Sequence, residues 1–265
     1  MTVEEIARIT RVAISLGISR VKLTGGEPLL RDDIGEIARR ISLIPSIEDT
    51  AMTTNGVLLK EKAEGLRKSG VKRLNISFVS LDERVYQDVT GGHLERVLDG
   101  IREAARAGFY PIKLNMVVLS AVNEKEVDRI TQFSRENGLV LQLIELEPVN
   151  VDSKYYSDHH MSLSRIEEHL KSMAISVETR RYMQNRRVYH LPGVKVEVVN
   201  PIENTEFCAH CTRLRLTSDG KLKPCLMRDD NLIDLLTPLR EGADDAALTS
   251  LFLKAVERRE PYFKP

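Results

Sequence analysis

The chain has 265 residues, of which 42% are apolar, so its length and composition predict one or two domains with a sizeable core. Its 39 basic and 39 acidic residues cancel at pH 7, which excludes the basic surface of a general nucleic-acid binder and the acidic excess of a disordered chain, and any anion site must be local. No apolar run of about 18 residues is present and the first helix is charged, so we expect a cytoplasmic protein without a membrane span or signal peptide.

Helical segments alternate with short β-branched runs in the first half of the chain, which predicts βα units and a parallel sheet. The first helix begins at a capping box formed by Thr2 and Glu5 and ends at Gly17. Strands are expected at 20–24, 49–53, 73–77, 112–119 and 140–145, and further helices at 32–44, 58–68, 94–107 and 124–136.

The pattern changes after Pro148, which we take as the domain boundary: residues 1–148 are expected to form an incomplete α/β barrel and residues 149–265 a C-terminal α+β layer. Within that second part, residues 152–160 are polar and predict a loop, and residues 163–173 predict a helix. Short strands at 176–182, 188–191 and 194–199 are expected to form the second layer, followed by helices at 231–240 and 243–258.

The cysteines are clustered, since Cys208, Cys211 and Cys225 fall within 18 positions of one another. The segment between the last two predicts a β-hairpin, and if Thr217 faces Lys221 the hairpin folds Cys225 back beside the other two. Three thiolates in a reduced compartment can hold an iron–sulfur cluster with one open iron. A zinc ion with an unidentified fourth ligand and unligated buried thiols are the alternatives.

Other polar residues suggest an anion site near these cysteines. Arg213 and Arg215 alternate with leucines and point the same way on the hairpin, as phosphate-binding guanidinium pairs do, although a solvated strand face has the same pattern. Gly25-Gly26 follows the first strand, where parallel sheets bind ligands or simply turn. Lys113 lies inside an apolar strand and must either reach solvent or find an anion within the barrel.

Together these features resemble the radical S-adenosylmethionine (SAM) superfamily and, within it, the GTP 3′,8-cyclases (the MoaA family) that begin molybdenum-cofactor biosynthesis. The resemblance covers nearly the whole chain, and its most specific motifs are Leu23-Thr24-Gly25-Gly26-Glu27-Pro28, Thr53-Thr54-Asn55-Gly56, Asn75-Ile76-Ser77, Lys113-Leu114-Asn115 and the cysteine segment 207–226. It implies a partial TIM-type barrel that binds SAM, closed by a C-terminal layer whose three cysteines hold a [4Fe–4S] cluster with an open iron that GTP approaches.

The resemblance also implies roles for single positions. Gly26 and Ser77 match SAM contacts. Contacts to SAM or GTP are matched by Thr53, Lys113, Arg213 and Arg215, of which the last three match contacts near the triphosphate. Lys22 stands where the family often has an arginine, so the charge is kept without the fork geometry. Glu147 stands where relatives often have a methionine near SAM, and Phe78-Val79 replaces the usual Leu-Asp.

The family's Cys-x3-Cys-x2-Cys motif, which holds the second [4Fe–4S] cluster and allows SAM cleavage, would lie before Met1 together with the strand that leads to it. The strand at 20–24 is therefore expected at a bare sheet edge, and the printed chain is expected not to cleave SAM. The family's C-terminal Gly-Gly tail is also absent from residues 262–265.

The expected partners are GTP, SAM, a reductant, a downstream enzyme of the molybdopterin pathway and, among assemblies, a homodimer; no nucleic acid or membrane is expected. Two other functions stay open. One is a different radical SAM enzyme with an auxiliary cluster. The other is a non-catalytic nucleotide-binding protein that carries zinc or a cluster.

Overall fold

The computed structural model describes residues 1–263, so the last two residues of the segment 262–265, from which the Gly-Gly tail is absent, lie outside the described part. One curved sheet contains β1 (Arg20–Leu23), β2 (Asp49–Thr54), β3 (Arg73–Ser77), β4 (Ile112–Val118), β5 (Val140–Glu145), β6 (Ser176–Arg180), β7 (Arg186–Leu191) and β8 (Val194–Val199). The spatial order is β1-β2-β3-β4-β5-β8-β7-β6. The first six strands in this order are parallel, β7 is antiparallel to β8, and β6 is antiparallel to β7. The predicted open α/β sheet is confirmed, with β1 at one edge.

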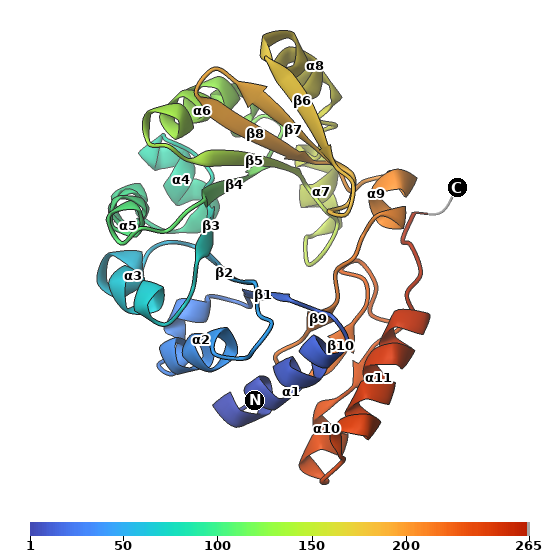
Figure 1. Ribbon diagram of the computed structural model, residues 1–265. Coiled ribbons are helices and arrows are strands. Elements are labelled where there is room, and N and C mark those ends of the chain that lie inside the picture. The colour runs from blue at the N-terminus through green and yellow to red at the C-terminus, as the bar shows by residue number, and fades with distance from the viewer. Residues whose placement is uncertain (264–265) are drawn as a thin grey trace.

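Helices cover the outer side of this sheet (Figure 1): α2 (Ile34–Ser42), α3 (Leu59–Lys68), α5 (Leu94–Arg106), α6 (Val127–Glu136) and α8 (Ser164–Met173). Each helix turns one apolar stripe inward, as Val97, Ile101 and Ala104 do in α5. These stripes pack on alternate strand residues such as Leu74 and Ile76 of β3. The main hydrophobic core therefore lies between the sheet and its outer helices.

The inner face of the same strands is polar. Side chains alternate along a strand, so the residues between the core positions point into the hollow of the curved sheet. Asn75 of β3 is the register partner of Lys113 of β4, and Gln142 of β5 is the partner of Glu197 of β8. All four side chains are buried although they are polar or charged. A buried polar face opposite an apolar core is the first structural indication of a ligand site.

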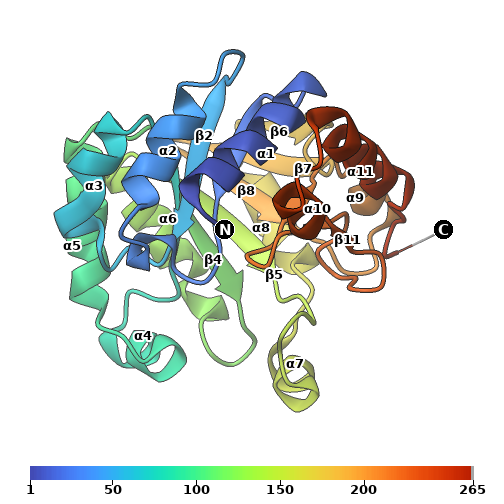
Figure 2. The ribbon, with the colours of Figure 1, turned by 90° about the horizontal axis from the view of Figure 1, so that it is seen from below.

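A C-terminal segment lies on this inner side of the sheet and packs on α1 (Val3–Ser15), whose predicted capping box of Thr2 and Glu5 is confirmed. The segment consists of α9 (Thr205–Ala209), β9 (Arg215–Leu216), β10 (Lys221–Lys223), β11 (Ile233–Asp234), α10 (Leu236–Arg240) and α11 (Asp245–Glu257). A second apolar cluster joins Ile9 and Val12 of α1 to Leu222 and Phe252. Figure 2 shows α10 and α11 beside α1 from a second direction.

The strands that we expected to form a second layer extend the first sheet instead. Residues Val140 to Ile144 of β5 pair in parallel with Lys195 to Val199 of β8, and β7 and β6 follow outward. The physical reason is that β5 would otherwise present unpaired backbone groups at an edge, and β8 satisfies them. The sheet therefore crosses residue 148, and the domain boundary at this position stays a prediction.

Local structure differs from the sequence prediction at three further places. The expected loop at 152–160 is wrong, because Asp152 caps the helix α7 (Ser153–His159) by accepting from two backbone amides. The helix α4 (Glu83–Thr90) was not expected, and Asp82 caps it in the same way. The first part of the expected helix at 231–240 is β11. Two 3-10 turns, η1 (Pro28–Leu30) and η2 (Glu124–Glu126), complete the elements.

Figure 2 shows α4 and α7 projecting from the same side of the molecule. Within residues 1–263, no helix is both long enough and apolar enough to cross a membrane.

Candidate functional site

The three cysteines and the two hairpin arginines line one pocket of about 570 Å³. All three thiols are free and half-buried. The lining of the pocket also contains Glu147, which follows β5, Gln184, which precedes β7, and Arg186, the first residue of β7. The pocket therefore joins the C-terminal segment to the rim of the sheet.

The hairpin has the register predicted from its sequence. Leu222 pairs with Leu216 and Lys223 pairs with Arg215, and the amide of Thr217 donates to the carbonyl of Lys221 at 2.9 Å. The ladder is short, because β9 contains two residues, so Cys211 and Cys225 lie beyond its paired part. Both cysteines nevertheless reach the same pocket.

Gly220 fixes the hairpin turn against α10. Its φ of +81° lies in the left-handed region, and a Cβ at this position would lie 2.3 Å from the side chain of Leu236. Its carbonyl accepts from the amides of Leu235 and Leu236, each at 3.1 Å. The turn therefore needs glycine both for its conformation and for its close approach to the following helix.

The three cysteine sulfurs of the pocket can be compared with the two kinds of metal group that the sequence leaves open. Among residues 1–263, no three Cys, His, Asp or Glu side chains converge closely enough to hold one metal ion, for which zinc–sulfur bonds of about 2.3 Å would be needed. A cluster accepts a wider arrangement, because each sulfur binds a different iron atom. Gln184 Nε2 donates to Cys211 Sγ at 3.5 Å, as hydrogen bonds to cluster sulfurs do. His210 Nδ1 donates to the backbone carbonyl of Glu206 at 3.0 Å, and His210 does not line the pocket.

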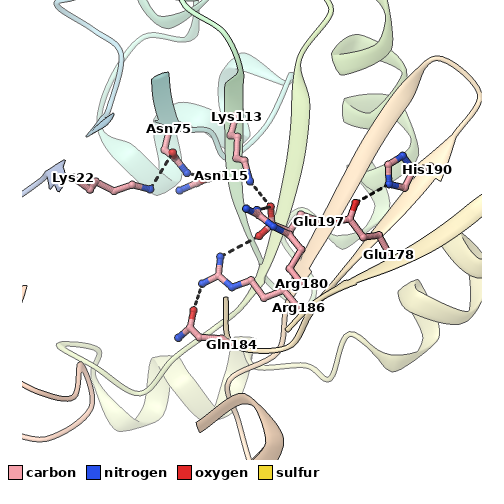
Figure 3. A network of polar contacts seen from close by, with 10 residues as sticks. All are labelled: Lys22, Asn75, Lys113, Asn115, Glu178, Arg180, Gln184, Arg186, His190 and Glu197. Carbon is pink, nitrogen blue, oxygen red and sulfur yellow. Dashed lines mark hydrogen bonds and ion pairs between the residues drawn. The ribbon is translucent and has the colours of Figure 1, made fainter. Parts of the chain in front are cut away.

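Two asparagines link the expected anion-binding lysine at position 22 to the middle of the sheet (Figure 3). Lys22 Nζ donates to Asn75 Oδ1 at 3.1 Å, and Asn75 Nδ2 donates to Asn115 Oδ1 at 3.0 Å. Lys22 is open to the hollow, yet the surrounding protein, together with Arg213 and Lys113, lowers the pKa of its ammonium to about 7. Without an anion, this lysine is close to losing its charge at neutral pH.

Lys113 finds an anion inside the protein rather than reaching solvent. Its Nζ forms an ion pair with the carboxylate of Glu197, which is 1% exposed and also accepts from Arg180 and Arg186. Burial opposes ionisation of Glu197, but Lys113 and Arg186 outweigh it and hold its pKa at about 2. Sequence analysis missed Glu197 and Arg186; the only available signal was a charged residue between the valines of a predicted strand.

The hairpin arginines carry charge that the protein only partly compensates. Burial lowers the pKa of Arg213 to about 10, with further contributions from Arg186 and Arg215. Burial also lowers the pKa of Arg215 and raises the pKa of Glu147, although Arg215 acts in the opposite direction on that carboxyl. Both arginines are thus held where an additional negative charge would be stabilised.

The remaining sequence-predicted residues lie at the carboxyl ends of strands, apart from the cysteine pocket. Gly26 follows β1, Thr53 lies near the end of β2, and Ser77 ends β3; Gly26 and Ser77 are exposed. The carboxylate of Glu27 joins the first two strand ends by accepting from Thr54 Oγ1 at 2.7 Å and the amides of Asn55 and Leu29 at 2.6 and 3.0 Å. None of these residues, nor Lys22 or Lys113, lines the pocket that holds the cysteines.

Comparisons with known proteins match both halves of the chain. Residues 1–134 match the radical SAM superfamily, and residues 139–265 match the family described as Molybdenum Cofactor Synthesis C. A "Probable GTP 3′,8-cyclase" of Methanococcus aeolicus is 44% identical over all of this chain and 87% of its own length. A protein of the same name from Pyrococcus horikoshii is 48% identical over 99% of this chain and 86% of its own length.

Solved structures show the same fold at lower identity. Streptococcus suis SuiB aligns with 85% of this chain at a TM-score of 0.63 and 21% identity. The chain spans 54% of SuiB, so this similarity concerns the shared fold alone.

Proposed function

Because the chain belongs to the radical SAM superfamily and, within it, to the family of GTP 3′,8-cyclases, we propose that it acts on GTP in molybdenum-cofactor biosynthesis. The product would be (8S)-3′,8-cyclo-7,8-dihydroguanosine 5′-triphosphate, formed by radical SAM chemistry. One observation carries the proposal at the level of residues: the three cysteines and the two half-buried hairpin arginines share a pocket.

We assign the sulfur ligands of a [4Fe–4S] cluster to Cys208, Cys211 and Cys225. When bound, the cluster would supply an open iron for the guanine, and SAM would supply the radical that starts the reaction. The residues assigned to the triphosphate are Lys22, Lys113, Arg213 and Arg215, and those assigned to SAM are Gly26, Thr53 and Ser77.

The chain's own residues would bind and orient the nucleotide. The half-buried guanidinium groups of Arg213 and Arg215, whose pKa values the surrounding protein lowers, are stabilised by a polyanion because it compensates charge that the protein leaves uncompensated. Arg213 and Arg215 approach the pocket from one hairpin, so both can contact one phosphate chain while the adjacent cysteines hold the cluster near the base. Positioning of this kind is the protein's main contribution when cofactors perform the chemistry.

We keep residue 148 as the proposed division between a SAM-binding part, residues 1–148, and a cluster- and GTP-binding part, residues 149–265. A reductant, a downstream pathway enzyme and a second copy of the chain are the further proposed partners.

Equilibrium binding and metal analysis of the anaerobically purified chain test the proposal. We expect about four irons per chain, preference for GTP over ATP, and loss of GTP binding in Arg213→Ala. Arg187→Ala is the matched control, because Arg187 is also on the sheet but 59% exposed. One zinc per chain without a preference for GTP would favour the non-catalytic alternative. Iron without any binding of GTP would favour a radical SAM enzyme for another substrate.

A further inference from the structure

Three cations from three strands meet at one buried carboxylate. Glu197 Oε2 accepts from Lys113 of β4 and from Arg180 Nη1 of β6 at 3.2 Å, and Glu197 Oε1 accepts from Arg186 Nη1 of β7 at 3.3 Å. Figure 3 shows these side chains converging on Glu197 from the strands on both sides of β8. One negative charge therefore holds three positive ones, and the group keeps a surplus of positive charge.

The register of the sheet makes this arrangement costly without Glu197. Arg180 and Arg186 are direct partners across the antiparallel pair of β6 and β7, where like charges destabilise a sheet. Lys113 has to reach across β5 to meet the same carboxylate, since β5 lies between β4 and β8. The fold thus collects cations that repel one another and orients all of them with a single anion.

One donor of this group has no partner in the protein. Among the described residues, the buried Nε of Arg186 makes no hydrogen bond, whereas its two terminal nitrogens are used by Glu197 and Gln184. Arg186 is 6% exposed and lines the pocket that contains the cysteines and Arg213. A buried, unpartnered N–H is unfavourable unless a ligand accepts from it.

We propose that Glu197 is a positioning residue, which fixes these three cations beside the nucleotide site, and that Arg186, the one of the three that lines the pocket, donates its Nε–H to a phosphate oxygen there. This inference rests on the proposed function, because it requires a nucleotide phosphate in the pocket. It adds Arg180, Arg186 and Glu197 to the residues derived above. Because the cations are already fixed before binding, their side chains lose less conformational entropy when the nucleotide binds.

Positioning and net charge predict opposite effects of removing the carboxylate. Glu197→Gln makes the site more positive by one charge, so a purely electrostatic site would bind a polyanion more tightly. If the carboxylate instead holds the cations in place, its loss lets them separate, and binding weakens despite the added charge. We expect the affinity for GTP and for inorganic tripolyphosphate to fall by about tenfold or more, as when one partner of a buried ion pair is removed.

Calorimetric titration of the intact chain with GTP and with tripolyphosphate measures this effect. Glu178→Gln is the matched control, because Glu178 lies on β6 of the same sheet, is 58% exposed and pairs with His190 rather than with the three cations. We expect Glu178→Gln to bind like the wild type and Glu197→Asp, which keeps the charge, to recover most of the affinity. Unchanged or tighter binding by Glu197→Gln would overturn the inference.

A second pair of variants removes the concern that Glu197→Gln fails to fold. Arg180→Gln combined with Glu197→Gln restores the wild-type net charge, and the inference requires this double variant to bind more weakly than Arg180→Gln alone. Stronger binding by the double variant would refute it. The proposed function is tested separately by Arg213→Ala. If neither the wild type nor any variant binds GTP, the proposed function is wrong. If GTP binding depends on Arg213 but not on Glu197, only the positioning role of Glu197 is wrong.

Discussion

Glu27 should stabilise the two strand ends that we assign to SAM binding, and replacing it by glutamine tests this. Its Oε1 accepts from the Leu29 amide and the Thr54 hydroxyl, and its Oε2 accepts from the Asn55 amide. A glutamine amide has one acceptor oxygen, so Glu27→Gln keeps at most two of the three hydrogen bonds and turns an NH₂ group toward a donor.

The expected cost follows from the number and exposure of these bonds. A hydrogen bond to a charged group contributes about 1.5–3 kcal/mol, and the lower end applies here because the loop is partly solvated. We therefore expect Glu27→Gln, which loses one bond, to lower the free energy of unfolding by about 1–2 kcal/mol, and Glu27→Ala, which loses all three bonds, to lower it by about 4.5 kcal/mol. A loss of about 1.4 kcal/mol in the bound geometry would weaken SAM binding by about tenfold.

Urea unfolding and calorimetric binding of SAM provide the two measurements. Glu48→Gln is the control, because Glu48 lies beside the same strands but its ion pair with Arg20 is exposed, and such pairs contribute less than about 1 kcal/mol. If Glu27→Gln and Glu48→Gln have equal stability and equal SAM affinity, Glu27 does not organise these loops.

Three further predictions concern the interior of the sheet and the cysteine pocket. The surrounding protein and Arg213 lower the pKa of Lys22 to about 7, so binding of tripolyphosphate should raise this pKa, and Lys22 should take up a proton from solution at pH 8. Calorimetric titrations in buffers of different ionisation heat should detect the proton uptake, and equal uptake by Lys22→Arg would contradict the prediction. Gln184→Leu should lower the reduction potential of the reconstituted cluster by roughly 20–60 mV, because a donor to Cys211 stabilises the reduced form; an unchanged potential in a redox titration would exclude this contact. Cys225→Ala should lower bound iron from about four per chain to nearly none, and retention of iron would remove Cys225 from the ligand set.

Local sequence signals predicted most of the sheet and the cysteine hairpin. The bounds of β3 and β5 match the prediction, because each short strand follows a helix closed by glycine and contains apolar residues at the positions that face the core. The hairpin register was predictable from its turn residues alone. The helix α7 was missed because it buries none of its residues, so no apolar periodicity marks it.

Features that depend on long-range pairing could not be predicted. Nothing near β5 in the sequence indicates that β8 will occupy its free edge, and this pairing is what brings β6, β7 and β8 into the sheet. The partner of Lys113 is 84 positions away in the chain and becomes visible only in this arrangement. Sequence analysis therefore left two possibilities for Lys113, contact with solvent or an anion within the barrel, whereas only the fold identifies Glu197 as the anion.

The formal neutrality of the chain conceals an uneven distribution of charge. The outer helices carry closely spaced ion pairs, such as Glu36 with Arg39 and Glu64 with Lys68. The hollow of the sheet instead gathers cations whose pKa values are lowered by burial and by one another, as in Lys22 and Arg213. This arrangement works against the stability of the empty protein and favours a bound polyanion by the same electrostatic interaction. The cations that lower the stability of the empty protein, such as Lys22 and Arg213, are therefore the residues from which we infer the nucleotide site.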